Sequence, residues 1–262
     1  MVEDIQQFVK NKSILFVGNS VEIMKHNLAE FIDGFDIVVR FGRAITLNEK
    51  QQKKLGKKCD IWITGQFRAP EFNKHRESFE SGEFKNTKIL LNRCRGNFKL
   101  KDWKIEEHLP DGMPYTQMFT DNEIIHLMKK EFNKDMLDNN EYRPSAGFIS
   151  LLWFIDKIKT YKDIHLIGFD FFAKKTNIKP TDKRGFTSNC RPHSWHLPVY
   201  VLNRPAHDGD MERKYVQKLV DRGFCHWYVL GNLKKEIVKY DGWMKGEKII
   251  SSIPRKTKVS KI

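Results

Sequence analysis

Cysteine is scarce in this chain of 262 residues, which has only four. No two of them form a CxxC pair, the spacing typical of a structural zinc site, and four are too few for a disulfide-dense secreted scaffold. The sequence therefore argues against both of these ways of stabilising a fold and favours a reducing compartment. The four cysteines are Cys59, Cys94, Cys190 and Cys225.

Long hydrophobic runs are also missing. No apolar stretch approaches the roughly 20 residues that cross a bilayer as a helix. The first twelve residues, MVEDIQQFVKNK, contain neither the apolar core nor the basic start of a signal peptide. We therefore expect a cytoplasmic protein with no membrane span, in the host cytoplasm if a phage encodes it.

The commonest nucleotide-binding motifs do not occur either. The chain has no GxGxxG and no P-loop, which disfavours a nicotinamide-dependent enzyme but leaves other nucleotides open. It also has no internal repeat and no low-complexity linker. The sequence therefore predicts one domain over residues 1–262, with a flexible basic loop at about 173–192 and a basic tail at about 245–262.

Positive charge is what the chain has in excess. Its 47 Lys and Arg against 33 Asp and Glu give a formal net charge of +14. Such a balance predicts a polyanionic partner or anionic ligands, and it concerns association rather than fold. A well-solvated surface is the simpler explanation, because many of these residues are scattered. Basic residues do gather, however, in the segment Lys50–Lys58 and in the predicted loop.

The stretch Ser13–Ala44 has the pattern of a βαβ unit. The apolar run Ile14–Val17 ends at the turn Gly18-Asn19-Ser20, helical periodicity follows over Val21–Ile32, and Asp36–Val39 is a second apolar run. In such units the turn after the first strand and the helix N-terminus behind it bind anionic ligands. A turn whose side chains merely cap the helix is an equally good interpretation of this motif alone.

Strands and helices alternate along the rest of the chain. This order predicts an α/β protein with one Rossmann-like domain, a mostly parallel sheet flanked by helices. Further strands are expected at Cys59–Gly65, Thr87–Asn92, Ile164–Phe169 and Phe224–Val229. Helices are expected within residues 1–12 and at Pro70–Gly82, Asp121–Met136, Phe148–Ile158 and from about Asp208 to Arg222, and Gly96–Met118 is expected to be irregular.

The candidate catalytic residue is His207. It lies just before a predicted helix that Asp208 or Asp210 could cap, so its imidazole would be open to solvent and could act as a general base near neutral pH. A lone histidine is more often structural, but His193 and His196 lie close by in sequence. The triplet from Asp208 to Asp210 has the DxD form of a metal site, yet capping explains it better, and no metal is expected.

Three separated segments together resemble glycosyltransferase family 29, the sialyltransferases. VGNS at Val17–Ser20, with Asp36 and Arg40, resembles the large motif of that family. RPSAGFISLLWFIDKIKTYKDIHLIGFDFF, starting at Arg143, resembles the small motif, and HDGDME, starting at His207, resembles the very small motif. The three segments follow one another in the family's order and span residues 13–212.

The resemblance implies a variant GT-A fold and an inverting, metal-independent transfer from a nucleotide sugar, with no cofactor. It implies that His207 deprotonates the acceptor, that His193 or His196 assists the departing phosphate, and that Glu212 is a structural partner on its helix. Asn19 and Ser20 would hold the phosphate and ribose. The implied donor-binding residues are Gly18, Asn19, Ser20, Arg40, Gly42, Thr64, Gly65, Ser145, Ala146, Gly147 and Asp170.

The chain departs from the family pattern in three respects. Gly42 stands where the family has an Asn that contacts nucleotide, and Ala146 replaces a residue with a hydroxyl group. The cysteines that link the large and small motifs are absent. The first two departures, at Gly42 and Ala146, indicate a donor other than the family's usual cytidine-monophosphate sialic acid.

The acceptor remains open between two kinds of hydroxyl group. The net charge favours hydroxymethylated cytosine in double-stranded DNA, as for the glycosylating enzymes of large phages, where a base in a duplex must be flipped out. The alternative acceptor is a lipopolysaccharide or capsule glycan that receives sialic acid or a related sugar. A non-catalytic nucleic-acid-binding protein is the third hypothesis. The residues expected to bind the acceptor DNA are Lys53, Lys54, Lys57, Lys174, Lys175, Lys183 and Arg184.

Overall fold

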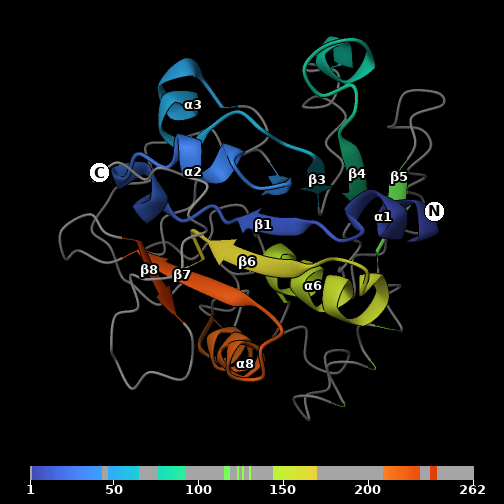
Figure 1. Cartoon of the computed structure of the whole chain (residues 1–262), viewed down its shortest axis with the longest axis vertical. Coiled ribbons are helices and arrows are strands. Elements are labelled where there is room, and N and C mark those ends of the chain that lie inside the picture. Colours follow the sequence, from blue (N-terminus) through green and yellow to red (C-terminus); the bar gives the residue numbers. More distant parts are fainter. Residues whose placement is uncertain are drawn as a thin grey trace, which may run out of the picture.

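An eight-stranded sheet forms the centre of the computed structural model (Figure 1). Its strand order is β5-β4-β3-β2-β1-β6-β7-β8, with seven parallel strands and β8 antiparallel to β7. This confirms the predicted α/β fold with a mostly parallel sheet. The structure describes residues 2–42, 47–64, 76–91, 115–118, 123, 126, 130, 144–169, 209–230 and 237–240.

The elements have the following bounds. The strands are β1 Ser13–Val17, β2 Ile37–Phe41, β3 Ile61–Thr64, β4 Lys88–Leu91, β5 Tyr115–Gln117, β6 Asp163–Ile167, β7 His226–Leu230 and β8 Ile237–Tyr240. The helices are α1 Val2–Val9, the 3-10 helix η1 Val21–Lys25, α2 Ala29–Asp33, α3 Glu49–Leu55, α6 Ala146–Trp153, its π-helical continuation η4 Phe154–Ile158, and α8 Gly209–Asp221.

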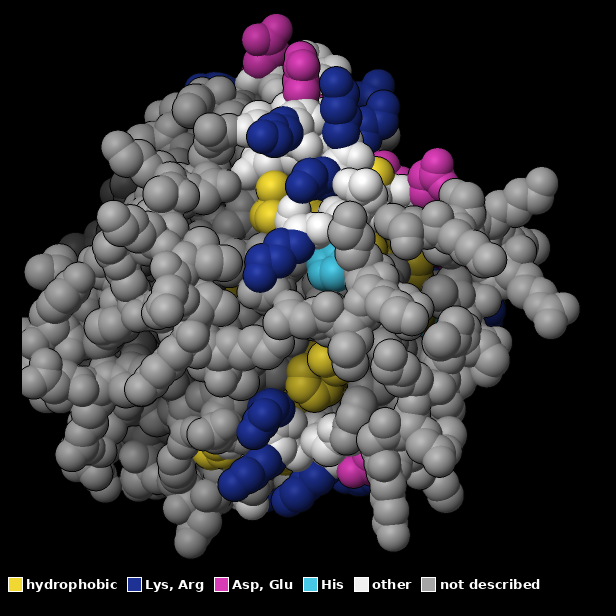
Figure 2. Space-filling model, turned by 90° about the vertical axis from the view of Figure 1, so that its left-hand side faces the viewer, with side chains coloured by type: hydrophobic (Ala, Val, Ile, Leu, Met, Phe, Trp, Pro, Cys, Tyr) yellow, Lys and Arg dark blue, Asp and Glu magenta, His cyan; other side chains and the backbone are white. Residues whose placement is uncertain are grey.

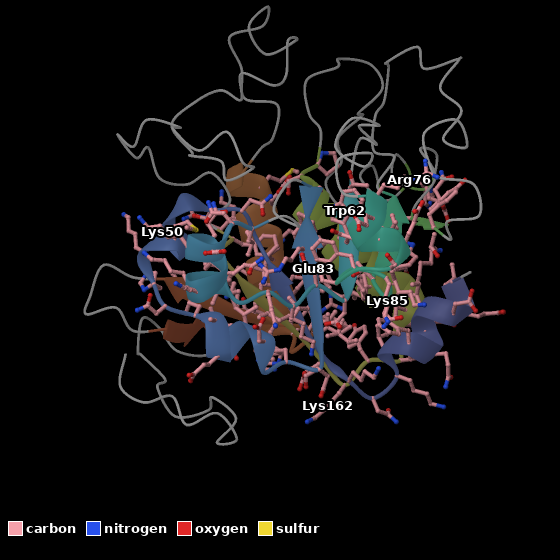
Figure 3. The ribbon with its side chains drawn as sticks, turned by 90° about the horizontal axis from the view of Figure 1, so that it is seen from above. Lys50, Trp62, Arg76, Glu83, Lys85 and Lys162 are labelled. Carbon is pink, nitrogen blue, oxygen red and sulfur yellow. The ribbon has the colours of Figure 1, made fainter. Side chains whose placement is uncertain are left out.

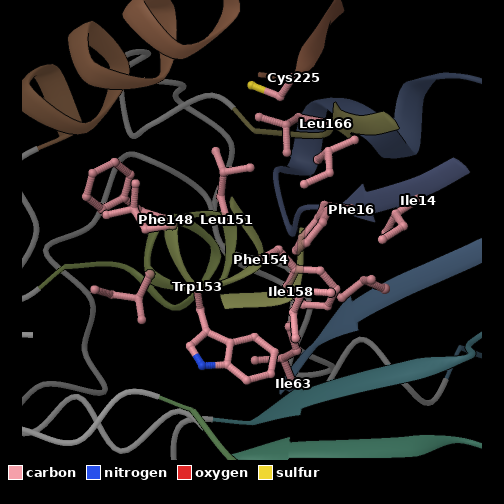
Figure 4. Close-up of a cluster of buried hydrophobic side chains, with 14 of the residues drawn as sticks. Ile14, Phe16, Ile63, Phe148, Leu151, Trp153, Phe154, Ile158, Leu166 and Cys225 are labelled. Carbon is pink, nitrogen blue, oxygen red and sulfur yellow. The ribbon is translucent and has the colours of Figure 1, made fainter. Parts of the chain in front are cut away.

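The central strands are mostly apolar because helices cover both faces of the sheet. In β1, Ile14 and Phe16 pack against α1, α6, η4 and α8, whereas Leu15 and Val17 pack against η1, α2 and α3. Figure 1 shows α2 and α3 on one side of β1 and α6 and α8 on the other. The ring of Phe154 meets that of Phe16 edge-on at 5.1 Å, which anchors η4 to the sheet (Figure 4).

One segment predicted as a single helix forms two separate helices in the structure. The segment expected to be a single helix over Val21–Ile32 consists of η1 and α2, separated by a break. The N–H of Leu28 donates to the carbonyl of Lys54 in α3 at 2.6 Å instead of to its own helix. A tertiary hydrogen bond that periodicity does not reveal therefore interrupts the helix.

The edges of the sheet were also not predicted. Strand β5 lies within Gly96–Met118, which was expected to be irregular, and β8 had no predicted counterpart. The other expected strands are confirmed, as are α1, α6 and α8. Residues 76–80 are helical, as are 123, 126 and 130, in agreement with the helices expected there.

Three expectations about the chain as a whole are not tested by these elements. The basic loop at 173–192 and the tail at 245–262 lie outside the described residues, and the single domain stays a prediction. Within the described ranges, no helix combines the length and the apolar character that crossing a membrane requires.

Candidate active site

The strand order reverses between β1 and β6. The chain leaves β1 toward β2 and continues outward to β5, then returns to β6 on the opposite side of β1. In the register of the sheet, Val17 aligns with Arg40 on β2 and with Ile167 on β6, so these three strands end level with one another. Parallel α/β sheets bind ligands in the crevice at the carboxyl ends of the strands where the order reverses.

The turn after β1 is fastened to both neighbouring strands. The N–H of Gly18 donates to the carbonyl of Ile167 at 2.7 Å, and that of Ser20 donates to the carbonyl of Gly168 at 3.1 Å. On the other side, Nδ2 of Asn19 donates to the carbonyl of Phe41 at 3.1 Å. These bonds position Asn19 at the switch point.

The structure limits which groups of this turn could bind an anion. The helix that follows is the five-residue 3-10 helix η1, which is too short to supply the dipole of a regular α-helix. The N–H groups of Gly18 and Ser20 already donate to the carbonyls of Ile167 and Gly168, and Ser20 is buried. The N–H groups of Gly18 and Ser20 are therefore not open to a ligand.

Helix α6 offers N–H groups in its first turn. Ser145 is its N-cap, and the Ser145 Oγ accepts from the N–H of Phe148 at 3.2 Å. In the described part of the chain, no acceptor is found for the N–H groups of Ala146 and Gly147 in the first turn. Free N–H groups at a helix N-terminus, together with the helix dipole, favour an anion.

A buried carboxylate joins α6 to α8. Glu212 is 0% exposed, and its Oε1 and Oε2 accept from the N–H of Ser145 at 2.7 Å and from the Ser145 hydroxyl at 2.6 Å. The implied structural role of Glu212 is confirmed by these bonds. They also place the start of α8 beside the N-terminus of α6, so two segments 67 residues apart meet at one edge of the sheet.

A comparison with known protein families shows to which family this chain belongs. Residues 10–224 match the profile of glycosyltransferase family 29 (sialyltransferase). The chain belongs to glycosyltransferase family 29. It is a glycosyltransferase, and the three motifs that suggested the family all lie within the matched region.

Two solved structures align with most of the length of this glycosyltransferase. The first, a mammalian sialyltransferase in complex with Gal-beta-1-3GalNAc-ortho-nitrophenol, has a TM-score of 0.47 and 16% identity over 85% of this chain and 71% of that chain. The second, also a mammalian sialyltransferase, has a TM-score of 0.44 and 15% identity over 83% of this chain and 69% of that chain. No curated protein sequence matches.

Arg40 of the family 29 chain has a structural role, which corrects the expected donor contact. Its guanidinium is 1% exposed and faces α3. The Nε atom donates to the carbonyl of Lys58, and Nη2 donates to the carbonyls of Leu55 and Gly56, at 2.8, 2.8 and 3.2 Å. Arg40 thus binds the carboxyl end of α3 to the sheet.

Gly42 and Thr64 end the next two strands at the same edge as Gly18. Gly42 has φ of +54°, and a Cβ atom placed on it would meet no atom of the described residues within 4 Å. This left-handed conformation favours glycine, and Asn tolerates it better than most other residues. Thr64 is buried.

At positions 18 and 147, close contacts with other parts of the protein leave no room for a Cβ atom. A Cβ atom on Gly18 would lie 2.4 Å from the carbonyl oxygen of Gly168, and one on Gly147 would lie 2.3 Å from Cε1 of Phe169. Phe169 was not among the predicted site residues. The pair Gly168-Phe169 after a buried strand, together with glycines in both other motifs, was the signal that could have identified it.

The three lysines of the predicted acceptor surface that the structure describes differ in role. Lys53 on α3 and Lys57, two residues after the end of α3, are exposed, whereas the ammonium of Lys54 donates to the carbonyl of Met24 at 2.9 Å. Lys54 is therefore a structural contact. Lys50, also exposed, lies one turn from Lys53 and Lys54 and belongs to the same face.

Several predicted site residues lie outside the described residues: Gly65, Asp170, Lys174, Lys175, Lys183, Arg184, His193, His196 and His207. Their roles stay predictions. Across the described ranges, no group of three or more His, Cys, Asp or Glu could hold a metal ion.

Proposed function

We propose that this glycosyltransferase moves a sugar from a nucleotide-sugar donor, bound at the carboxyl ends of β1 and β6, to an acceptor hydroxyl, with inversion and without a metal ion. The Glu212–Ser145 pair is the observation that carries the proposal, because it brings the α8 end of the very small motif to the N-terminus of α6. The donor phosphate would bind the N–H groups of Ala146 and Gly147 there.

His207 is proposed as the general base. In the sequence it precedes the first residue of α8 by two positions. In a direct displacement, the imidazole accepts the proton of the acceptor hydroxyl while the oxygen bonds to the anomeric carbon. The bond from that carbon to the donor phosphate oxygen breaks, and His193 or His196 stabilises the departing phosphate.

The test of the base is His207→Ala. We expect kcat to fall about 10³-fold, within the range of general-base catalysis, while nucleotide affinity stays unchanged. His126→Ala, at an exposed position, is the control and should leave kcat unchanged. Full transfer by the His207 variant would refute the assignment. Absence of nucleotide binding by the wild type would instead favour the non-catalytic hypothesis.

Hydroxymethylated cytosine in double-stranded DNA is the proposed acceptor. The net charge of +14 and three exposed lysines, Lys50 and Lys53 on α3 and Lys57 just after it, support this choice. Lys and Arg predominate over Asp and Glu among the described side chains in Figure 2. Within the described residues, none of these three ammonium groups pairs with a carboxylate. Contacts with phosphates would give affinity that falls steeply with salt.

The acceptor is tested by duplex binding across a salt series, with thermal-shift screening of nucleotide sugars in parallel. Alanine at Lys50, Lys53 and Lys57 should reduce the slope of log K against log salt by up to about 3. The control carries alanine at the exposed Lys10, Lys85 and Lys162, two of which Figure 3 labels away from Lys50. No duplex binding at low salt, together with transfer to a glycan, would establish the alternative acceptor.

A further inference from the structure

We infer that Phe169 is a positioning residue of the donor site, the contact through which three of its elements are held in register. Phe169 follows β6 by two residues, directly after Gly168. Its Cδ2 would lie 3.0 Å from a Cβ atom on Gly18, and its ring packs edge-on against that of Phe41 at 5.8 Å. The turn after β1 and the end of β2 therefore both rest on this ring.

The third element is the first turn of α6. Three ring atoms of Phe169 (Cε1, Cζ and Cδ1) would lie 2.3, 3.1 and 3.4 Å from a Cβ atom on Gly147. Only a glycine at position 147 lets the helix approach the ring this closely. The N–H groups of Ala146 and Gly147, which are the proposed phosphate donors, thus have their distance from the sheet set by Phe169.

The main chain of Phe169 is itself fixed from two sides. Gly168 has φ of +72°, a left-handed conformation that directs the chain out of β6, and this position favours glycine. The carbonyl of Phe169 accepts from Nε1 of Trp227 on β7 at 3.1 Å. Phe169 is therefore held in place by β7, and its ring in turn fixes the positions of the elements of the donor site that pack against it.

Binding and catalysis are sensitive to small changes in the positions of the groups that contact the ligand. Displacement of binding or catalytic groups by about 1 Å can cost on the order of 10²-fold in rate. Loss of the Phe169 ring would let the first turn of α6 move against the turn after β1. This inference rests on the proposed donor site, since it concerns groups that would hold the donor phosphate.

The test compares Phe169→Leu with Phe154→Leu, the same change at another ring of the same core. Nucleotide affinity is measured by calorimetry with whichever of CMP, UDP and GDP stabilises the wild type most. We expect Phe169→Leu to weaken binding about 10-fold and Phe154→Leu to leave it within about 2-fold, although both lower Tm. Equal affinities in the two variants would overturn the inference.

A second set of variants tests the contact itself. Gly147→Ala should weaken nucleotide binding, and Phe169→Leu in the same chain should restore part of it, because leucine lacks the Cε1 and Cζ atoms that the new methyl meets. Gly18→Ala should not be rescued in this way, since its nearest atom is the main-chain oxygen of Gly168. Rescue of neither or of both variants would contradict the inference. Failure of the wild type to bind any nucleotide would overturn both the inference and the proposed donor site.

Discussion

At the scale of single residues, the site depends on a buried carboxylate. Glu212 is fully enclosed, and both of its oxygens accept from Ser145, whose hydroxyl also caps α6. Hydrogen bonds to a charged acceptor are stronger than neutral ones, and an unsatisfied buried donor is costly. One side chain therefore fixes the start of α6 relative to α8.

Glu212→Ala tests this role. We expect the free energy of unfolding to fall by about 3 kcal/mol, because the N–H and hydroxyl of Ser145 lose their acceptors and a cavity forms. Ser145→Ala should cost less, about 1–2 kcal/mol, because the N–H of residue 145 keeps its bond to Glu212. Urea denaturation measures both variants. Glu83→Ala, at an exposed position, serves as the control (Figure 3), and an equal effect there would contradict the assignment.

At the scale of elements, the attachment of α3 to the sheet depends on Arg40. The guanidinium donates to carbonyls at the carboxyl end of α3, which the helix itself leaves without partners. The helix begins with a capping box between Asn48 and Gln51. Burial lowers the pKa of Arg40, whereas Cys59, Asp33 and Asp60 act in the opposite direction and favour the charged form.

Replacing Arg40 separates the structural role from the donor contact first expected. Arg40→Gln should lower the free energy of unfolding by about 3 kcal/mol, because several buried carbonyls lose their donor. Nucleotide affinity of the folded variant should stay unchanged. Calorimetry and urea denaturation of one preparation give both quantities. Normal stability with lost nucleotide affinity would show that Arg40 contacts the donor after all.

The amino end of β6 carries a pH-dependent contribution to stability. Burial raises the pKa of Asp163, but the neighbouring groups of His165 and Ser13 lower it more strongly and hold this pKa at about 2, below the ordinary 3.8. Nε2 of His165 lies 3.1 Å from Oδ1 of Asp163. A lowered carboxyl pKa stabilises the fold above the unfolded value, and this contribution disappears as pH falls toward the folded value.

Asp163→Asn should therefore destabilise the protein in a pH-dependent way. We expect a loss on the order of 1 kcal/mol at pH 7, reduced by solvent screening of the partly exposed group, and no difference from wild type near pH 2. Thermal unfolding of both proteins from pH 7 to pH 2 measures the difference. Asp156→Asn is the control, and a pH-independent difference for Asp163→Asn would contradict the account.

At the scale of the whole molecule, the sequence predicted the sheet because its central strands are buried on both faces and appear as apolar runs. It did not predict the division of η1 from α2, which depends on a bond from Leu28 to α3. The three-residue strand β5 carries too few apolar residues to stand out. The contact between Glu212 and Ser145 spans 67 residues, so only the fold reveals it.

The central claim is that a nucleotide-sugar donor binds where β1, β6 and α6 meet. Hydrogen exchange of the whole chain, with and without the nucleotide that stabilises it most, tests this directly. The account predicts slower exchange in peptides covering Val17–Ser20 and Ala146–Phe148, and unchanged exchange at the amino ends of the strands, around Lys12 and Lys162. Protection confined to the amino ends, or no change at Ala146 and Gly147, would contradict it.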